Sequence, residues 1–224
     1  MSEVIRLENV VCMTPDNWRA VNGISLCIGE QEHVMLCADS GISSDALMRI
    51  IAGVEKPSSG EVFVLSQAVH AMSSGEAAVF RNRHIGAVLE EPGFIDKLSI
   101  AENISLPLII RGINRHRSRE AAEDLLNTLG IRHVANALPA QLSVYETRAA
   151  GIARALITKP KILLLNEVTA RLSVRDSEKI TETLSVIGEY GGCTALWIGN
   201  IANEAIHANR TIRLENGKIR EDRK

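Results

Sequence analysis

Three short runs of consecutive apolar residues constrain the fold more than any other feature of this chain. They are His33 to Ala38 (HVMLCA), Lys161 to Leu165 (KILLL) and Thr194 to Ile198 (TALWI). Each run has the length of a strand and lacks the alternation of a strand with one wet face, so each is predicted to be buried on both faces. The predicted helices cover residues 45–52, 118–129, 143–157 and 176–189, and Ser118 is the expected N-cap of the second. Apolar strands that alternate with helices indicate an α/β fold with a mostly parallel sheet.

The remaining strand signals predict smaller antiparallel parts. Val4 to Val10 and Ile24 to Ile28 flank the Asn22-Gly23 turn, and a second hairpin surrounds Asn216-Gly217 near the end of the chain. Further strands are expected at residues 61–65 and 84–89. The stretch from about Pro92 to Leu156 is mostly helical in pattern. We therefore expect a single domain over residues 1–224, with residues 92–156 as an inserted helical subdomain.

Composition excludes several classes of function. The formal net charge is −2 and aromatic residues make up 3% of the chain, which argues against nucleic-acid binding. No apolar run approaches the roughly 18 residues of a membrane span, and no secretory signal begins the chain. The four cysteines have no metal-ligand spacing and are expected to be reduced core thiols. These features favour a cytoplasmic protein without a resident metal.

The strand, glycine-containing loop and helix around residue 40 form the context in which a phosphate-binding loop occurs. Together with LMRIIAGVEKPSSG (47–60), GIARAL (151–156) and the closing ENGKI (215–219), this context resembles the ATP-binding subunit of an ABC transporter. The segment AENISLPLIIRG (101–112) resembles the lipoprotein-release and macrolide-export branch. The resemblance implies a P-loop NTPase-type (RecA-like) core, an antiparallel β-subdomain and an inserted helical subdomain.

The nucleotide motifs of that family are altered here. Its phosphate loop, G-x-x-x-x-G-K-[ST], corresponds to ADSGISSD at residues 38–45. Both end glycines of the motif are replaced, by Ala38 and Ser43, although Gly41 remains inside the loop. The phosphate-gripping lysine is Ser44 and the magnesium-binding hydroxyl is Asp45. Gly41, Ser43, Ser44 and Asp45 are the candidate phosphate-binding positions.

The motifs that follow in the chain also depart from the family. The Walker B pair is Asn166-Glu167, so the position of the catalytic base keeps its glutamate. Glu90 replaces the magnesium-sensing glutamine, and Asn200 replaces the switch histidine. The signature L-S-G-G-Q reads LSVYE, which keeps Ser143 alone of its central residues. The adenine-stacking aromatic expected near residues 12–14 is absent, and the dimer-contact segment reads ARLS at 170–173.

These changes weaken the expected binding of ATP. A triphosphate carries about four negative charges, and a hydrogen bond from the lost lysine would contribute roughly 1.5–3 kcal/mol. Asp39, Asp45, Glu90 and Glu167 are expected to cluster near the phosphates, where a carboxylate about 5 Å away costs roughly 3 kcal/mol at an effective dielectric of about 20. We expect no bound cofactor, although Asp45 and Glu90 remain conceivable ligands for a cation.

The chain is therefore predicted to be a degenerate cassette subunit without ATPase activity. It would dock on a membrane permease through the region Phe94 to Arg111 and lie on the inner face of the cell membrane. It would act structurally or in regulation, as a homodimer or as a heterodimer with a competent cassette. Val144 and Tyr145 are expected to crowd the approach of Ser143 to a partner's nucleotide.

Two alternatives stay open. One is an atypical but active subunit that binds and hydrolyses ATP with Mg²⁺. The other is a soluble inhibitor or scaffold that pairs with a competent cassette. The basic run Arg111 to Arg119 is either a solvated face or a contact for acidic lipid headgroups or an acidic partner loop.

Overall fold

The computed structural model describes residues 2–38, 41–89, 91–199 and 208–224, and for residues 185–191 it describes the backbone alone. The chain forms two compact units. Unit 1 comprises Met1–Arg83 with Gly192–Lys224, and unit 2 comprises His84–Gly191. The predicted single domain with an insert at residues 92–156 remains a prediction.

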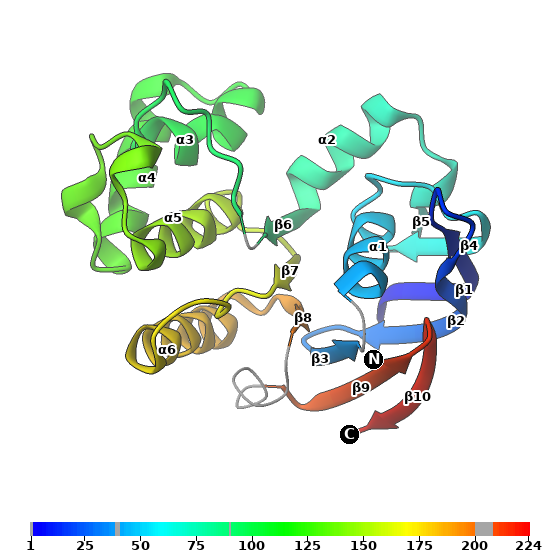
Figure 1. The fold of residues 1–224 in the computed structure, drawn as a ribbon. Coiled ribbons are helices and arrows are strands. Elements are labelled where there is room, and N and C mark those ends of the chain that lie inside the picture. The colour runs from blue at the N-terminus through cyan, green and yellow to red at the C-terminus, as the bar shows by residue number, and fades with distance from the viewer. Residues whose placement is uncertain (1, 39–40, 90, 200–207) are drawn as a thin grey trace. The chain divides into compact units, whose positions relative to one another are not determined.

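Figure 1 labels the elements of both units. Unit 1 contains β1 (Glu3–Met13), β2 (Arg19–Gly29), β3 (His33–Ala38), α1 (Gly41–Ile51), β4 (Ser59–Val64), β5 (Gln67–Ala68), a 3₁₀ turn (Val69–Ala71), α2 (Ser74–His84), β8 (Thr194–Ile198), β9 (Arg210–Glu215) and β10 (Lys218–Arg223). The last residue of α2, His84, is counted with unit 2. Unit 2 contains β6 (Ile85–Val88), α3 (Ile100–Ile110), α4 (Arg115–Thr128), 3₁₀ turns at Arg132–Val134 and Pro139–Gln141, α5 (Val144–Leu156), β7 (Ile162–Asn166) and α6 (Val174–Gly191).

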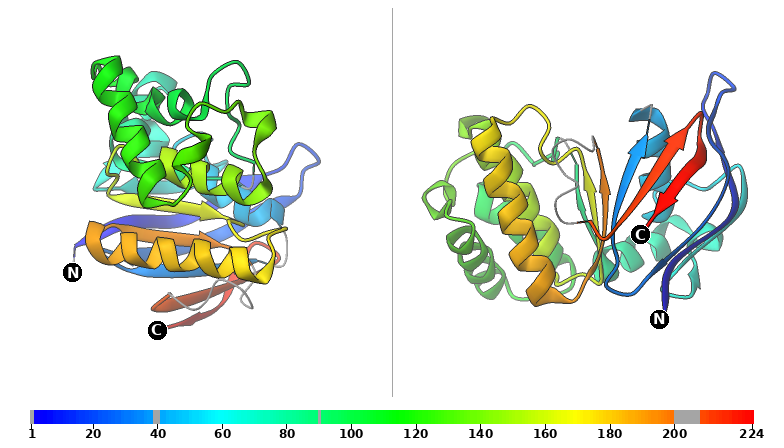
Figure 2. Two further views of the ribbon diagram at one scale, coloured as in Figure 1. Left: turned by 90° about the vertical axis from the view of Figure 1, so that its left-hand side faces the viewer. Right: turned by 90° about the horizontal axis from the view of Figure 1, so that it is seen from below.

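Two sheets make up the core of unit 1. The antiparallel sheet has the order β2-β1-β4-β5. In the second sheet β3 pairs in parallel with both β8 and β9, and β10 adds an antiparallel edge. Figure 2 shows the β9–β10 hairpin beside the β1–β2 sheet. Every residue of β8 and the middle four residues of β3 are buried, as the continuous apolar runs predicted.

One arginine side chain links the last two strands of the chain to β2 within unit 1. The guanidinium of Arg210 on β9 lies 2.7 Å from both carboxylate oxygens of Asp222 and 2.9 Å from Glu32. It also donates to the carbonyl of Cys27 on β2 at 2.7 Å. These bonds join β10 and β2 to the parallel strands, so the closing hairpin is part of the fold and not an appendage.

Unit 2 contains the parallel pair β6–β7 and four helices. The apolar core lies where α3, α4 and α5 pack together, through Ile104, Leu126 and Ile152 among others. Gly86 on β6 lies so close to α5 that an added Cβ would come within 2.4 Å of the Ala155 carbonyl oxygen. Only glycine permits this close approach of the strand to the helix.

The structure corrects two predicted helix starts and adds two helices, α2 and α3, to those predicted individually. The helix predicted from residue 45 begins at Gly41, and the helix predicted from Ser118 begins at Arg115. Ser118 is not its N-cap: Asn114 accepts the backbone N–H of His116 at 2.8 Å, while the buried Ser118 hydroxyl bonds the Asn114 carbonyl. Helix α2 was not predicted because only Ala77 and Phe80 of its residues are buried, which leaves little periodicity to detect.

Candidate functional site

The first turn of α1 carries the residues of the altered phosphate loop. Residues 39–40 lie outside the described residues, so the turn is known from Gly41 onward. The Ser44 hydroxyl donates to the Gly41 carbonyl at 3.2 Å. Ser43 is completely buried, and its hydroxyl has no hydrogen-bond partner among the described residues. Neither hydroxyl supplies the positive charge that a lysine would bring to a phosphate.

Asp45 forms an ion pair with a basic residue that lies outside the phosphate-loop motif. Its carboxylate lies 2.7 Å from the guanidinium of Arg49, one turn later on α1, and Arg49 also bonds Glu55 at 3.0 Å. The spacing of four residues is the sequence signal that would have revealed this pair. Part of the negative charge expected at this position is therefore already balanced. An aspartate committed to an arginine is also a poorer substitute for a magnesium-binding hydroxyl.

An aromatic side chain does occur near the end of β1, although not at residues 12–14. Trp18 lies in the β1–β2 turn and is 41% exposed. The turn is held by Thr14, whose N–H donates to the Trp18 carbonyl at 2.8 Å and whose hydroxyl accepts the Trp18 N–H at 3.1 Å. An exposed tryptophan in a polar turn was the available signal. Trp18 and α1 belong to the same unit.

The Walker B positions follow β7 directly. Asn166 ends the strand, and Glu167 adopts a left-handed backbone with φ of 47°. The Glu167 carbonyl accepts the N–H of Ala170 at 3.0 Å. Its carboxylate is partly exposed and makes no hydrogen bond or ion pair with a described residue, so it does not cap the following turn.

Ser143 of the altered signature serves as the N-cap of α5. Its hydroxyl accepts the Glu146 N–H at 3.3 Å and donates to the Glu146 carboxylate, which in turn accepts the Ser143 N–H. The same carboxylate lies 2.7 Å from the imidazole of His133. The Ser143 hydroxyl and backbone, and then His133, lower the pKa of Glu146. The signature therefore has a structural function within its own subunit.

The side chains of Tyr145 and Val144 differ in their exposure to solvent. The ammonium of Lys179 on α6 lies 5.1 Å from the centre of the Tyr145 ring, so this ring packs against its own unit. Val144 is 56% exposed. Of the two substitutions at the signature glycines, Val144 is the one that presents an apolar side chain to solvent.

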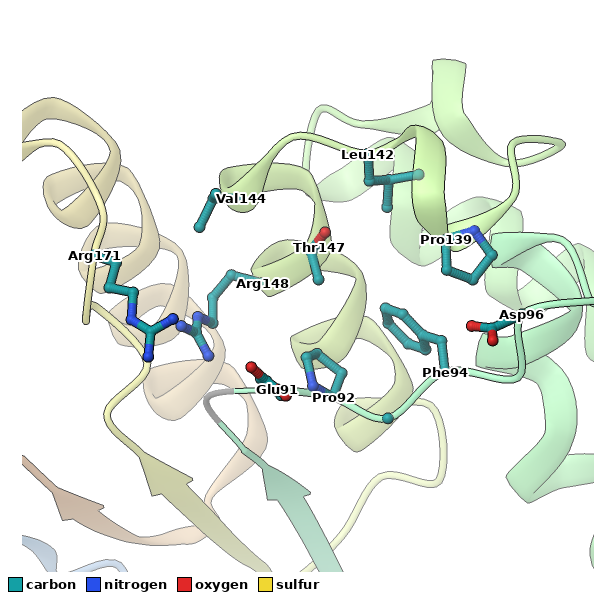
Figure 3. Close-up of a pocket in the computed structure, with 11 residues that line it drawn as sticks. Glu91, Pro92, Phe94, Asp96, Pro139, Leu142, Val144, Thr147, Arg148 and Arg171 are labelled. Carbon is teal, nitrogen blue, oxygen red and sulfur yellow. The ribbon is translucent and has the colours of Figure 1, made fainter.

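Unit 2 contains a pocket of about 400 Å³ beside the start of α5. Figure 3 shows Phe94 in the pocket near Pro92 and Pro139, with Arg148 and Arg171 at the other end. The lining residues are Glu91, Pro92, Gly93, Phe94, Asp96, Pro139, Leu142, Val144, Thr147, Arg148 and Arg171. The pocket therefore joins the segment after β6 to the altered signature. Its apolar floor lies between charged side chains of both signs.

Two polar side chains fix the segment that carries Phe94. Arg154 on α5 donates to the carbonyls of Pro92 and Gly93, and its guanidinium carbon lies 4.8 Å from the Phe94 ring centre. Asn103 on α3 is completely buried and donates to the carbonyls of Leu98, Ser99 and Ile95 at 3.0–3.1 Å. Its amide oxygen accepts the Ile95 N–H at 2.7 Å.

Arg148 lies at the other end of the pocket. Its guanidinium is buried and donates to the carbonyl of Leu89 at 2.9 Å and to that of Ala170 at 3.3 Å. One side chain thus joins α5 to the segments after β6 and after β7. An arginine within the largely apolar helix 143–157 was the sequence signal that Arg148 is unusual, although it did not indicate the partners of the guanidinium.

The predicted site residues fall into three groups. Asp39, Glu90 and Asn200 lie outside the described residues. Gly41 to Asp45 belong to unit 1, whereas Ser143, Asn166 and Glu167 belong to unit 2. The expected cluster of carboxylates therefore remains a prediction. Among the described residues, no group of three or more His, Cys, Asp or Glu side chains could hold a metal ion.

Residues 21–170 match the family model described as ABC transporter. The chain belongs to the ABC transporter family. The match covers more than half of the chain and includes α1, the signature and the end of β7. The expected fold is confirmed: a mixed, mostly parallel sheet of the P-loop type, an antiparallel β-subdomain and a helical subdomain.

Relatives of this cassette match along nearly its whole length. The ABC transporter ATP-binding protein YbbA of Escherichia coli K12 is 31% identical over 220 residues, which are 98% of this chain and 96% of YbbA. The lipoprotein-releasing system ATP-binding protein LolD of Geobacter metallireducens is 31% identical over 199 residues, 89% of this chain and 88% of LolD. The dimeric post-hydrolysis structure of the cassette MJ0796, bound to ADP and Pi, aligns with a TM-score of 0.92 at 29% identity over 98% of both chains.

The described residues do not fit ATP and magnesium in the way that the family motif implies. The serine at the lysine position donates its hydroxyl hydrogen to the Gly41 carbonyl, and the aspartate at the hydroxyl position pairs with Arg49. The sequence from Gly41 to Asp45 contains no lysine or arginine, the cations that would contact a triphosphate directly.

Proposed function

We propose that this chain is an ABC cassette subunit that binds ATP weakly or not at all and acts by docking on a membrane permease. The observation that carries the first half is the Asp45–Arg49 ion pair of 2.7 Å at the position of the magnesium-binding hydroxyl. The loop has no basic side chain to replace the missing lysine. The subunit then transmits or stabilises a conformation and does not power it, on the inner face of the membrane.

Calorimetry tests the nucleotide half. The purified chain is titrated with ATP, with and without Mg²⁺, beside a variant that restores the loop (Ala38→Gly, Ser43→Gly, Ser44→Lys, Asp45→Ser). We expect no heat of binding up to millimolar ATP for the native chain and a clear gain of affinity for the restored loop, because one lysine contributes roughly 1.5–3 kcal/mol. Micromolar binding by the native chain would overturn this half of the proposal.

The pocket around Phe94 supports the docking half. It has an apolar floor held by Arg154 and Asn103, and it belongs to the stretch predicted to meet the permease. The apolar side chains of α3 differ in burial. Ile100 and Ile104 lie in the core. The partly exposed ones are Leu106, Leu108 and Ile109. A partner segment with an apolar side chain could fill the pocket without disturbing that core.

Co-purification with a permease of the lipoprotein-releasing type tests the docking half. Phe94→Ala removes the floor of the pocket and should reduce recovery of the complex about tenfold, as expected for a central aromatic contact. Val79→Ser, at an exposed apolar residue of α2 in unit 1, is the control and should leave recovery unchanged. Equal recovery with Phe94→Ala would contradict docking at this pocket.

One observation favours the atypical ATP-binding alternative, namely the exposed Trp18 in the same unit as α1. An aromatic ring at this hairpin offers an adenine a surface for stacking. Quenching of tryptophan fluorescence by ATP, absent in Trp18→Phe, would support that alternative. Trp197 is buried in β8, so it provides the internal reference.

A further inference from the structure

The second half of α3 is apolar but not buried. Ile100, Ala101 and Ile104 lie in the core of unit 2, whereas Ile110 at the end of the helix is 73% exposed. Ile113, in the turn that follows, is 43% exposed. No carboxylate occurs between Asn103 and Arg119, so this apolar end is followed directly by a basic run.

The turn after α3 has a fixed shape. Gly112 has a left-handed backbone with φ of 84°, its N–H donates to the Ile109 carbonyl, and the N–H of Ile113 donates to the Leu108 carbonyl at 3.0 Å. Asn114 then caps α4. Because both helix ends are capped, Ile110 and Ile113 are held in place and are not the result of a frayed helix.

Basic residues follow these isoleucines in the sequence. Arg115 and Arg117 are exposed and form no ion pair with any described residue. Arg111 donates to the carbonyl of Thr158 at 3.2 Å, which brings the exposed Lys159 next to the same turn. The nearest paired group is His116, which lies 3.3 Å from Glu120. We call Ile110, Ile113, Arg115, Arg117 and Lys159 the α3–α4 tip.

We propose that the α3–α4 tip binds the surface of a bilayer that contains anionic lipids. The two isoleucines enter the boundary between headgroups and acyl chains, and the cationic side chains contact headgroup phosphates. An acidic protein loop would satisfy the arginines but leave the isoleucines in water. A bilayer surface provides an apolar layer and a layer of negative charge within one side-chain length, which matches the interleaved order of these residues.

This inference goes beyond the proposed function, since it needs neither nucleotide nor permease. It predicts that the isolated chain has an affinity of its own for anionic membranes. Weak binding of this kind would add to the permease contact, because two weak membrane signals together give stable attachment where one does not.

Vesicle sedimentation tests the proposal with the purified full chain. Vesicles of phosphatidylcholine alone are compared with vesicles that contain about 30% phosphatidylglycerol, at low and at physiological salt. We expect binding to the anionic vesicles that weakens with salt. Arg115→Gln with Arg117→Gln, and separately Ile110→Ser with Ile113→Ser, should each lower partitioning by about fivefold or more.

The matched control places the same kinds of substitution in unit 1. Val54→Ser with Arg213→Gln changes an exposed apolar and an exposed basic residue, and should leave partitioning within about twofold of the native value. Thermal unfolding verifies that every variant is folded, and Arg115→Glu with Arg117→Glu provides a stronger version of the charge test.

Three results would overturn the proposal. They are equal binding to both kinds of vesicle, unchanged binding of the isoleucine variant, and tip-dependent binding of soluble polyglutamate in the absence of vesicle binding. The last result would assign the tip to an acidic protein partner. These outcomes are independent of the ATP titration, so failure here is distinguishable from failure of the proposed function.

Discussion

The guanidinium of Arg154 lies over the ring of Phe94, with 4.8 Å between the guanidinium carbon and the ring centre. The same guanidinium donates to the carbonyls of Pro92 and Gly93. One side chain of α5 therefore holds the backbone and the aromatic ring that form the pocket floor. The pocket owes its shape to this contact, because the segment 91–99 contains no helix or strand of its own.

Arg154→Met should lower the free energy of unfolding by about 2 kcal/mol, because it leaves partly buried carbonyls without their charged donor. Urea unfolding of the purified chain measures this effect. Arg132→Met is the control, since Arg132 is 60% exposed and paired only with Glu123 at the surface. Equal losses for the two variants would show that Arg154 has no special role.

Asn103→Leu should be more damaging, with a loss of about 3 kcal/mol. The change keeps the branching of the side chain at Cγ but removes the donor to three carbonyls and the acceptor of the Ile95 N–H. Asn103→Asp retains the acceptor alone. Equilibrium unfolding should therefore give the native chain a higher free energy of unfolding than either variant. A loss below about 1 kcal/mol for Asn103→Leu would contradict this account.

Ser143→Ala tests whether the signature serine is structural. We expect a loss of about 1 kcal/mol from removal of the N-cap. Ser99→Ala is the matched control, because Ser99 forms the same capping box with Glu102 at the start of α3. Similar losses in thermal unfolding are expected. If only Ser143→Ala altered the ATPase rate of a paired competent cassette, its hydroxyl would have a nucleotide role after all.

Asp222 should make stability depend on pH in acid. The hydrogen bonds and charge of Arg210 lower the pKa of Asp222 in the folded chain. A lowered carboxylate pKa stabilises the folded state above the unfolded pKa of about 3.9, and this contribution is lost as pH falls through the folded value. The difference in unfolding free energy between the native chain and Asp222→Asn should be constant above about pH 5 and shrink below about pH 4.

Urea unfolding of the native chain and of Asp222→Asn at pH 7, 5, 4 and 3 measures this difference in unfolding free energy. Glu221→Gln, at the neighbouring and partly exposed carboxylate that pairs with Arg223, is the control variant. A difference that grows toward pH 3 would have the wrong sign and would exclude the Arg210–Asp222 pair as its cause.

The class of fold follows from the amino-acid sequence, because consecutive apolar residues, as in the strand Thr194 to Ile198, predict a strand buried on both faces. The sequence also determined the family, through stretches such as Leu47 to Gly60, and the absence of the lysine at Ser44. It placed helix ends less well, as Ser118 shows, since several polar residues in a row can each act as a cap and only the backbone decides which one does.

The contacts of the polar residues in unit 2 depend on the tertiary structure. Arg148 reaches Leu89 and Ala170, which are 59 and 22 residues away, and Arg154 reaches Pro92 at a separation of 62. Periodicity reports the environment of a residue relative to its neighbours along the chain, and it contains no information on which distant carbonyl a side chain meets. The exposure of Ile110 likewise followed from packing, because the apolar pattern of α3 continues to a residue that the core does not cover.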